Sequence, residues 1–185
     1  MGIEKHVPTR ALTSAFDLVI NWARKHSLWP MTFGTACCGI EIMSVLASRY
    51  DLGRFGSERV SFSPRQADLL IVAGRVQRRE MYVLQRIYDQ MAEPKWVISM
   101  GACASSGGIF DTYSMIQGVD RFIPVDVYIP GCPPKPEDII NSLLLLRKKI
   151  QKHESVKKEP DRKLKDIYDP HSDYHPRFPE FRKDE

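Results

Sequence analysis

Long apolar runs are missing from this sequence of 185 residues. The four leucines at 143–146 are far short of the roughly 20 residues that a membrane-spanning helix needs. The N-terminus has no apolar segment of a secretory signal, and the Met-Gly start carries Val7 where a myristoylation signal prefers Ser or Thr. We therefore expect a protein that is soluble or peripheral to a membrane and that works in a reducing compartment.

A strong charge of either sign is also absent. The chain has 27 Lys and Arg against 23 Asp and Glu, a net charge of +4. Aromatic residues are not interleaved with a basic stripe, as they are in proteins that bind single-stranded nucleic acid. We interpret the small basic excess as a solvated or partner-facing surface, and we expect no nucleic-acid partner.

Familiar catalytic motifs are lacking as well. The five histidines lie in the N-terminal part and in the tail, at positions 6, 26, 153, 171 and 175. The glycine-rich stretch 101–108 lacks the Gly-Lys-Ser/Thr ending of a phosphate-binding loop, and no Gly-x-Gly-x-x-Gly follows a predicted strand. No nucleophile–base pair can be assembled, so we predict no independent catalytic residues.

Cysteine is scarce, and its placement is informative. Cys37 and Cys38 are adjacent in Thr-Ala-Cys-Cys-Gly, Cys103 lies in Gly-Ala-Cys-Ala, and Cys132 lies in Pro-Gly-Cys-Pro-Pro. All four occur in glycine- or proline-marked segments, and the two singles are predicted to lie in loops. In a reducing compartment, such cysteines more often bind metals or act in catalysis than form disulfides.

Helices and short buried strands alternate along the chain. The apolar runs 67–73 and 96–100 end at glycines, which is typical of buried parallel strands, and 121–128 leads into a third strand. Amphipathic helices are expected over residues 14–26, 38–49, 76–91 and 137–151.

This alternation predicts an α/β fold with an open, mainly parallel sheet and helices on both faces. We expect three parts, which are an N-terminal arm and helix (1–30), an α/β domain (31–152) and an extended C-terminal tail (153–185). The tail is rich in Lys, Glu, Asp and Pro and has little apolar periodicity.

Two of the cysteines follow predicted strands. Cys103 comes just after the glycine that ends the second strand, and Cys132 just after the glycine that ends the third. The carboxyl ends of parallel strands lie at one edge of a sheet, where binding sites form. We therefore expect these two thiols, far apart in the chain, to lie at the same edge.

Three interpretations of the four cysteines compete. They could be small buried hydrophobic residues, although the loop settings fit that poorly. Structural zinc usually needs Cys-x2-4-Cys knuckles, which this chain lacks. A [4Fe–4S] cluster takes four thiolates, and adjacent cysteines can then bind different irons. The flanking glycines allow close backbone approach, so a cluster is the favoured interpretation.

Several long motifs resemble one family. Residues 34–41, 63–68, 98–103 and 125–134 are similar, in order, to the B-type component of proton-pumping NADH–quinone oxidoreductase, respiratory complex I. The likeness covers roughly residues 20–150. Two segments depart from the family pattern. Gly39 stands where Ala is common, and residues 76–82 replace the usual Thr-x-Lys-Met-Ala-Pro.

The resemblance implies a flavodoxin-like core and a role in electron transfer. It implies that Cys37, Cys38, Cys103 and Cys132 ligate one [4Fe–4S] cluster, the last in the chain from NADH and the donor to quinone. It also implies contacts with other complex I subunits, namely the 49-kDa-type D subunit, the ferredoxin-like I subunit, the membrane H subunit and the C subunit. The expected location is peripheral, on the cytoplasmic side of a bacterial inner membrane or the matrix side in mitochondria.

The resemblance points to further residues around the cluster. Trp29 and Met43 match regions that line the quinone cavity between this chain and the D subunit, although core packing would also explain them. We also hypothesise that Glu41 couples the cluster to a proton and that the nearby cation Arg65 raises its potential. Inter-subunit salt bridges are the alternative for both.

Two other classes of function remain open. One is the cluster-bearing small subunit of a related membrane hydrogenase or of a dehydrogenase that does not use NADH. The blocks at 111–114 and 125–128 favour complex I over this alternative. The other is a flavodoxin-like module that binds a flavin or nucleotide without metal, which iron and sulfide analysis would distinguish.

Overall fold

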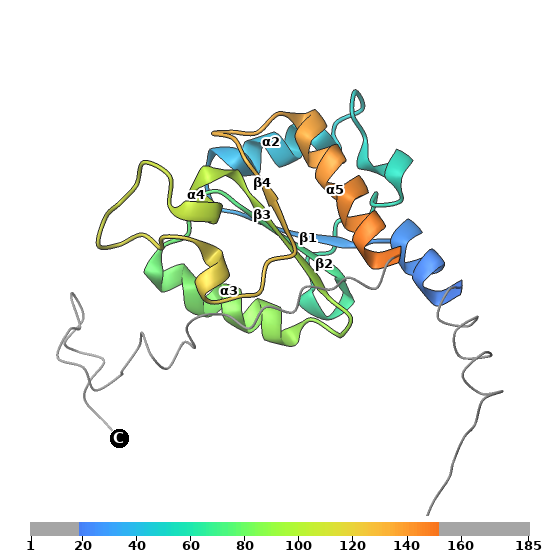
Figure 1. The fold of residues 1–185 in the computed structure, drawn as a ribbon, viewed down its shortest axis with the longest axis horizontal. Helices are drawn as coiled ribbons and strands as arrows, with labels where there is room; N and C mark the ends of the chain where they lie inside the picture. Colours follow the sequence, from blue (N-terminus) through green and yellow to red (C-terminus); the bar gives the residue numbers. More distant parts are fainter. Residues whose placement is uncertain (1–18, 152–185) are drawn as a thin grey trace, which may run out of the picture.

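Four short strands form one parallel sheet in the computed structural model, which describes residues 19–151 (Figure 1). Neighbouring strands are paired in the order β1-β2-β3-β4. Their bounds are Pro30–Gly34 for β1, Leu69–Ala73 for β2, Trp96–Met100 for β3 and Val127–Ile129 for β4. All three pairings are parallel, so the four carboxyl ends lie at one edge of the sheet.

The two central strands were predictable because they are buried on both faces. All five residues of β2 and all five of β3 are buried, as expected for continuous apolar runs in a parallel sheet. The edge strand β1 was not predicted, since it begins with Pro30 and is only half-buried. The strand expected to follow residues 121–128 is confirmed only at Val127–Ile129, after a 3-10 turn at Val119–Arg121.

Helices cover both faces of the sheet, as predicted (Figure 1). The helices α2 (Cys37–Leu46) and α5 (Pro136–Gln151) pack on the face that carries Ile71 and Ile98. The helix α3 (Arg78–Gln90) packs on the opposite face with Leu70 and Val97. Each fully buried side chain of this kind stabilises the fold by about 2 kcal/mol relative to an exposed one.

The strand order explains why α2 and α3 lie on opposite faces. A flavodoxin-like sheet has the strand order 2-1-3-4-5. When its outer strand, number 2, is removed, the order 1-3-4-5 remains, and these four strands correspond to β1-β2-β3-β4 here. Residues 47–68, with 3-10 turns at Leu52–Phe55 and Pro64–Gln66, occupy the position of that strand. On the free edge of β1, the Ser61 N–H donates to the Pro30 carbonyl at 2.8 Å.

The helices expected from the sequence are largely confirmed. Residues 19–26 are helical, which agrees with the helix expected over 14–26, while residues 14–18 and the tail 153–185 lie outside the described residues. The other three predicted helices are confirmed with ends that differ by at most three residues. Among residues 19–151, no helix is both long enough and apolar enough to cross a membrane.

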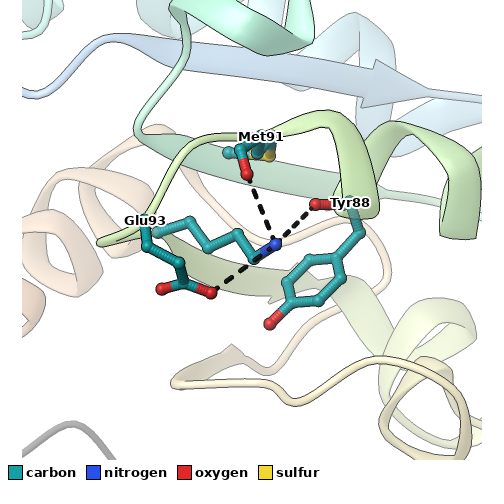
Figure 2. Close-up of polar contacts among 4 residues, drawn as sticks. Tyr88, Met91 and Glu93 are labelled. Carbon is teal, nitrogen blue, oxygen red and sulfur yellow. Dashed lines mark hydrogen bonds and ion pairs between the residues drawn. The ribbon is translucent and has the colours of Figure 1, made fainter.

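A single lysine closes the C-terminal end of α3 (Figure 2). The Lys95 ammonium donates to the Tyr88 carbonyl at 2.8 Å and to the Met91 carbonyl at 3.4 Å. It lies 3.6 Å from the Glu93 carboxylate and 4.0 Å from the Tyr88 ring centroid, and its side chain is 9% exposed. A cation there satisfies helix-end carbonyls and complements the helix dipole, so Lys95 sets the turn between α3 and β3.

We predict that Lys95→Met loosens this turn. The substitution keeps most of the apolar volume but removes the ammonium donor from the carbonyls of Tyr88 and Met91, at a cost of about 1–3 kcal/mol. The Tyr88 carbonyl then relies on the Met91 N–H at 3.2 Å. Hydrogen–deuterium exchange of the amides at 86–92 should therefore become roughly five- to a hundredfold faster. Lys148→Met, which removes an exposed lysine on α5, is the control and should not change these amides. Equal exchange in the two variants would show that Lys95 does not hold the helix end.

Candidate metal centre

All four cysteines lie at the carboxyl edge of the sheet. Cys37 and Cys38 are the first residues of α2, and two residues separate them from the end of β1. Cys103 lies in the short helix α4 (Gly101–Ser106), which follows β3 directly, and Cys132 lies in the turn after β4. The expectation that Cys103 and Cys132 follow strand ends at one edge is confirmed, although Cys103 lies in a helical turn and not in a loop. The unpredicted strand β1 brings the adjacent pair to the same edge.

Close backbone contacts join the three cysteine-bearing segments. A Cβ added at Gly101, whose φ is +89°, would lie only 2.6 Å from the Cys38 Sγ. The Ala102 N–H donates to the Gly131 carbonyl at 2.9 Å, so the ends of β3 and β4 are hydrogen-bonded to each other. Glycine is needed at 101 both for its left-handed backbone and for the space that the Cys38 sulfur occupies.

The thiols are close enough to influence one another electrostatically. Burial raises the pKa of Cys38 to about 12, and the neighbouring thiols of Cys37, Cys103 and Cys132 contribute to this rise. Burial also raises the pKa of Cys103, with smaller contributions from Cys132 and Cys37. Four neighbouring thiolates repel one another, and a bound metal centre supplies the positive charge that offsets this repulsion.

The described residues do not form a site for a single metal ion. Within residues 19–151, no three His, Cys, Asp or Glu side chains are close enough to hold one metal ion. Thiolates that each bind a different iron of a cube do not have to meet at one point. The residue before α2 is Ala36, which has no side chain that could cap the helix. The first N–H groups of α2 therefore favour an anionic group beside Cys37 and Cys38.

Gly39, where the family commonly has Ala, lies in a close contact with Gly34. A Cβ at Gly39 would lie 3.2 Å from the Cα of Gly34, and a Cβ at Gly34 would lie 3.0 Å from the Cα of Gly39. The last residue of β1 and the first turn of α2 therefore approach each other through two glycines. This close approach holds the cysteine pair against the sheet edge.

The other predicted site residues fall into two groups. Glu41 lies about one turn after Cys37 on α2 and is half-buried, and Met43 is 71% exposed on the same helix. Trp29 directly precedes β1, and Arg65 lies in the 3-10 turn before β2. Trp29 and Arg65 are therefore at the amino end of the sheet, about 13 Å from the cysteine edge along the strands. The structure does not bring them to the cysteines.

An exposed apolar face continues from Cys37 along α2. Cys37, Ile40 and Met43 are spaced three residues apart, and all three are exposed, with Ile40 at 70%. Residues at this spacing share one face of a helix. At the amino end of the sheet, Trp29 is instead covered by Arg59, whose guanidinium lies 4.4 Å from the ring centroid.

The segment that departs from the family pattern still begins a helix. The Gln77 N–H donates to the Glu80 carboxylate at 3.0 Å, which completes a capping box at the start of α3. Gln77 also forms an antiparallel bridge with Met115, and the Arg78 N–H donates to the Ser114 carbonyl at 2.9 Å. The altered residues therefore change the surface at this point while the helix start is kept.

Arg75 was missed by the sequence interpretation. It follows Gly74, the glycine after β2, and so has the same strand-end position as the segments of Cys103 and Cys132. Its guanidinium lies 4.4 Å from the centroid of the Phe110 ring. The strand-end argument that located Cys103 and Cys132 would also have located Arg75, had it been applied to charged residues.

Known proteins share both the sequence and the fold. Residues 36–146, which include all four cysteines, match the family described as NADH ubiquinone oxidoreductase, 20 Kd subunit. The chain is 57% identical to the B-type subunit of NADH-quinone oxidoreductase from Campylobacter fetus, over 85% of this chain and 93% of the relative. It is 51% identical to the corresponding protein of Aliarcobacter butzleri, over 91% of this chain and 98% of the relative.

Two solved structures are similar at different distances. A chain of an archaeal membrane-bound sulfane sulfur reductase is 41% identical with a TM-score of 0.71, covering 74% of this chain and 77% of that one. A chain of the [NiFeSe] hydrogenase of Desulfovibrio vulgaris Hildenborough is 18% identical with a TM-score of 0.51, covering 68% of this chain and 62% of that one, and shares the fold alone. On the family match and the curated relatives, this chain belongs to the family of the 20-kDa, or B-type, subunit of the oxidoreductase complex NADH–quinone oxidoreductase.

Proposed function

We propose that Cys37, Cys38, Cys103 and Cys132 hold one [4Fe–4S] cluster, which is the terminal cluster that reduces quinone in the complex. The observation that carries the proposal is the arrival of four thiols from three separate segments at one edge of the sheet. When bound, such a cluster accepts and donates single electrons. The chain contributes position, exclusion of water and electrostatics.

The burial of the four thiols divides the site into two sides. Cys38 and Cys103 are buried against the sheet, at 2% and 7% exposure, whereas Cys37 and Cys132 are exposed. The buried pair would keep water from one side of the cluster, and the exposed pair would leave the other side for a partner. An electron carrier needs such a face, because its donor and acceptor are on other molecules.

The exposed face of α2 makes the open side of the site apolar. Ile40 and Met43 extend an apolar surface from Cys37, which fits contact with a partner subunit and with an apolar quinone. On this proposal the D subunit faces α2, and the I, H and C subunits complete the surroundings. Glu41, on the same helix, remains the candidate for proton coupling. The chain would be peripheral, on the cytoplasmic side of a bacterial membrane or the matrix side in mitochondria.

A second candidate function has one observation in its favour. The 41% identity to a chain of a sulfane sulfur reductase shows that similar chains occur in other membrane complexes. The cluster could then serve a complex that does not use NADH or quinone. The higher identities to the two bacterial relatives favour NADH–quinone oxidoreductase. Assays of the purified complex would decide between the two functions, by comparing the rate of quinone reduction with NADH to the rate with other electron donors.

The proposal predicts that Cys132→Ala removes one cluster. Its thiol is exposed, so the loss of the side chain leaves the core packed while the cluster loses a ligand. In the purified complex, iron and acid-labile sulfide should each fall by up to about four atoms, the content of one such cluster, and one electron paramagnetic resonance signal should disappear or change. Ser106→Ala, an exposed change in α4, should leave the signal intact.

Other results would contradict the proposal. An unaltered set of signals in Cys132→Ala would remove this residue from the ligand set. One zinc ion at this site, without sulfide, would replace the cluster by a structural ion. A bound flavin without iron at this site would favour the metal-free module.

A second prediction concerns the space beside Cys38. Gly101→Ala places a Cβ 2.6 Å from the Cys38 Sγ and strains a backbone with φ near +89°. Gly118→Ala is the matched control, because Gly118 has φ near +95° but its added Cβ meets Asp120 and the Ser105 carbonyl. Both variants carry a backbone cost of about 1–2 kcal/mol. Gly101→Ala alone should lose cluster iron, and equal iron content in the two variants would argue against a site at Cys38.

A further inference from the structure

We propose that the Arg75 guanidinium is a fixed positive charge that raises the reduction potential of the cluster, an inference that rests on the proposed function. Sequence reasoning assigned this role to Arg65, which lies before β2 at the amino end of the sheet. Arg75 lies at the other end of the same strand, at the cysteine edge. Its main chain and its side chain are each held by a cysteine-bearing segment.

The main chain of Arg75 is bound to the segment that precedes Cys37. The Thr35 N–H donates to the Ala73 carbonyl at 3.0 Å, and the Thr35 hydroxyl donates to the Arg75 carbonyl. Between them, Gly74 is buried with φ +103°, and a Cβ there would lie 2.9 Å from the Cβ of Ala36. The Arg75 main chain is therefore bonded to a residue only two positions before the cysteine pair.

The side chain of Arg75 is held by the segment that follows Cys103. Its guanidinium stacks over the Phe110 ring at 4.4 Å from the centroid. The Phe110 N–H donates to the Gly107 carbonyl at 3.2 Å, and the Gly107 N–H donates to the Cys103 carbonyl at 2.9 Å. Two hydrogen bonds thus connect the segment of the ring to Cys103, which makes Phe110 a positioning residue for the cation.

Within residues 19–151, no neighbouring carboxylate neutralises the charge of Arg75. In the part of the chain that the structure describes, no Asp or Glu forms an ion pair with Arg75. The side chain is half-buried, so water screens it less than it screens a fully exposed arginine.

The direction of the effect follows from charge. Reduction adds one electron to an already anionic cluster with four thiolates, and a nearby cation stabilises the more negative state. Removing the cation should therefore make the cluster harder to reduce. At a fixed ambient potential, we expect the ratio of reduced to oxidised cluster to fall by about tenfold, which corresponds to 59 mV for one electron.

The test is a redox titration of the purified complex, followed by the electron paramagnetic resonance signal of this cluster. Arg75→Gln should lower the midpoint potential, and Arg75→Lys, which keeps a positive charge, should keep it close to the wild-type value. Arg78→Gln is the matched control, because it removes the same charge three residues further on, from an exposed site at the start of α3. If Arg75 had only a structural role, the midpoint potentials of Arg75→Gln and Arg75→Lys would not differ.

Each outcome decides the inference. A midpoint for Arg75→Gln equal to that of Arg78→Gln would overturn it. If Arg75→Gln loses the signal while Arg75→Lys keeps it, the positive charge itself is needed beside the cluster, which supports the inference. If both lose it, Arg75 acts by packing and the inference is wrong. A wild-type complex without this signal would instead show that the proposed cluster is absent.

Discussion

The parallel pairing of four short strands is the constraint on which the site depends. Because every strand runs in the same direction, residues that are distant in the sequence come together after each strand ends. The buried side chains of β2 and β3 fix the register on both faces, so the carboxyl ends cannot shift along one another. The cysteines, Gly101 and Arg75 all take their positions from this register.

The parts of the fold that could be predicted from the sequence are those buried on both sides. Residues 67–73 and 96–100 are mostly apolar runs that form strands buried on both faces, so their interpretation was correct. The helix after Pro136 was predictable for another reason, because proline marks its start. Strand β1 begins with proline and is half-buried at the edge of the sheet, so it has neither an apolar run nor strict alternation. Without it, geometry placed only Cys103 and Cys132, and the convergence of all four cysteines depended on the family resemblance.

The position of a residue relative to its strand also explains why Arg65 and Trp29 were predicted as site residues and Arg75 was not. Arg65 is part of a family motif and Trp29 of a region that resembles the family's quinone cavity, whereas distance in the fold depends on the end of the strand at which a residue lies. Arg65 and Trp29 precede strands, and Arg75 follows one. Two close contacts at the site also could not be predicted. Gly34 meets Gly39 because a strand and the helix after it lie against each other, and Gly101 meets Cys38 across a long stretch of sequence. Neither contact is encoded by a local sequence pattern.

The proposed cluster site must satisfy two opposing requirements, and the burial of the cysteines fits both. An iron–sulfur cluster is protected by exclusion of water, which Cys38 and Cys103 favour from the buried side. Electron transfer requires an accessible side, which Cys37 and Cys132 leave open next to Ile40 and Met43. A partner that covers this apolar side would complete the exclusion of water while bringing the acceptor close. The division of the thiols into a buried and an exposed pair therefore favours a cluster whose exposed side is covered by a partner subunit, over a cluster that a single chain encloses.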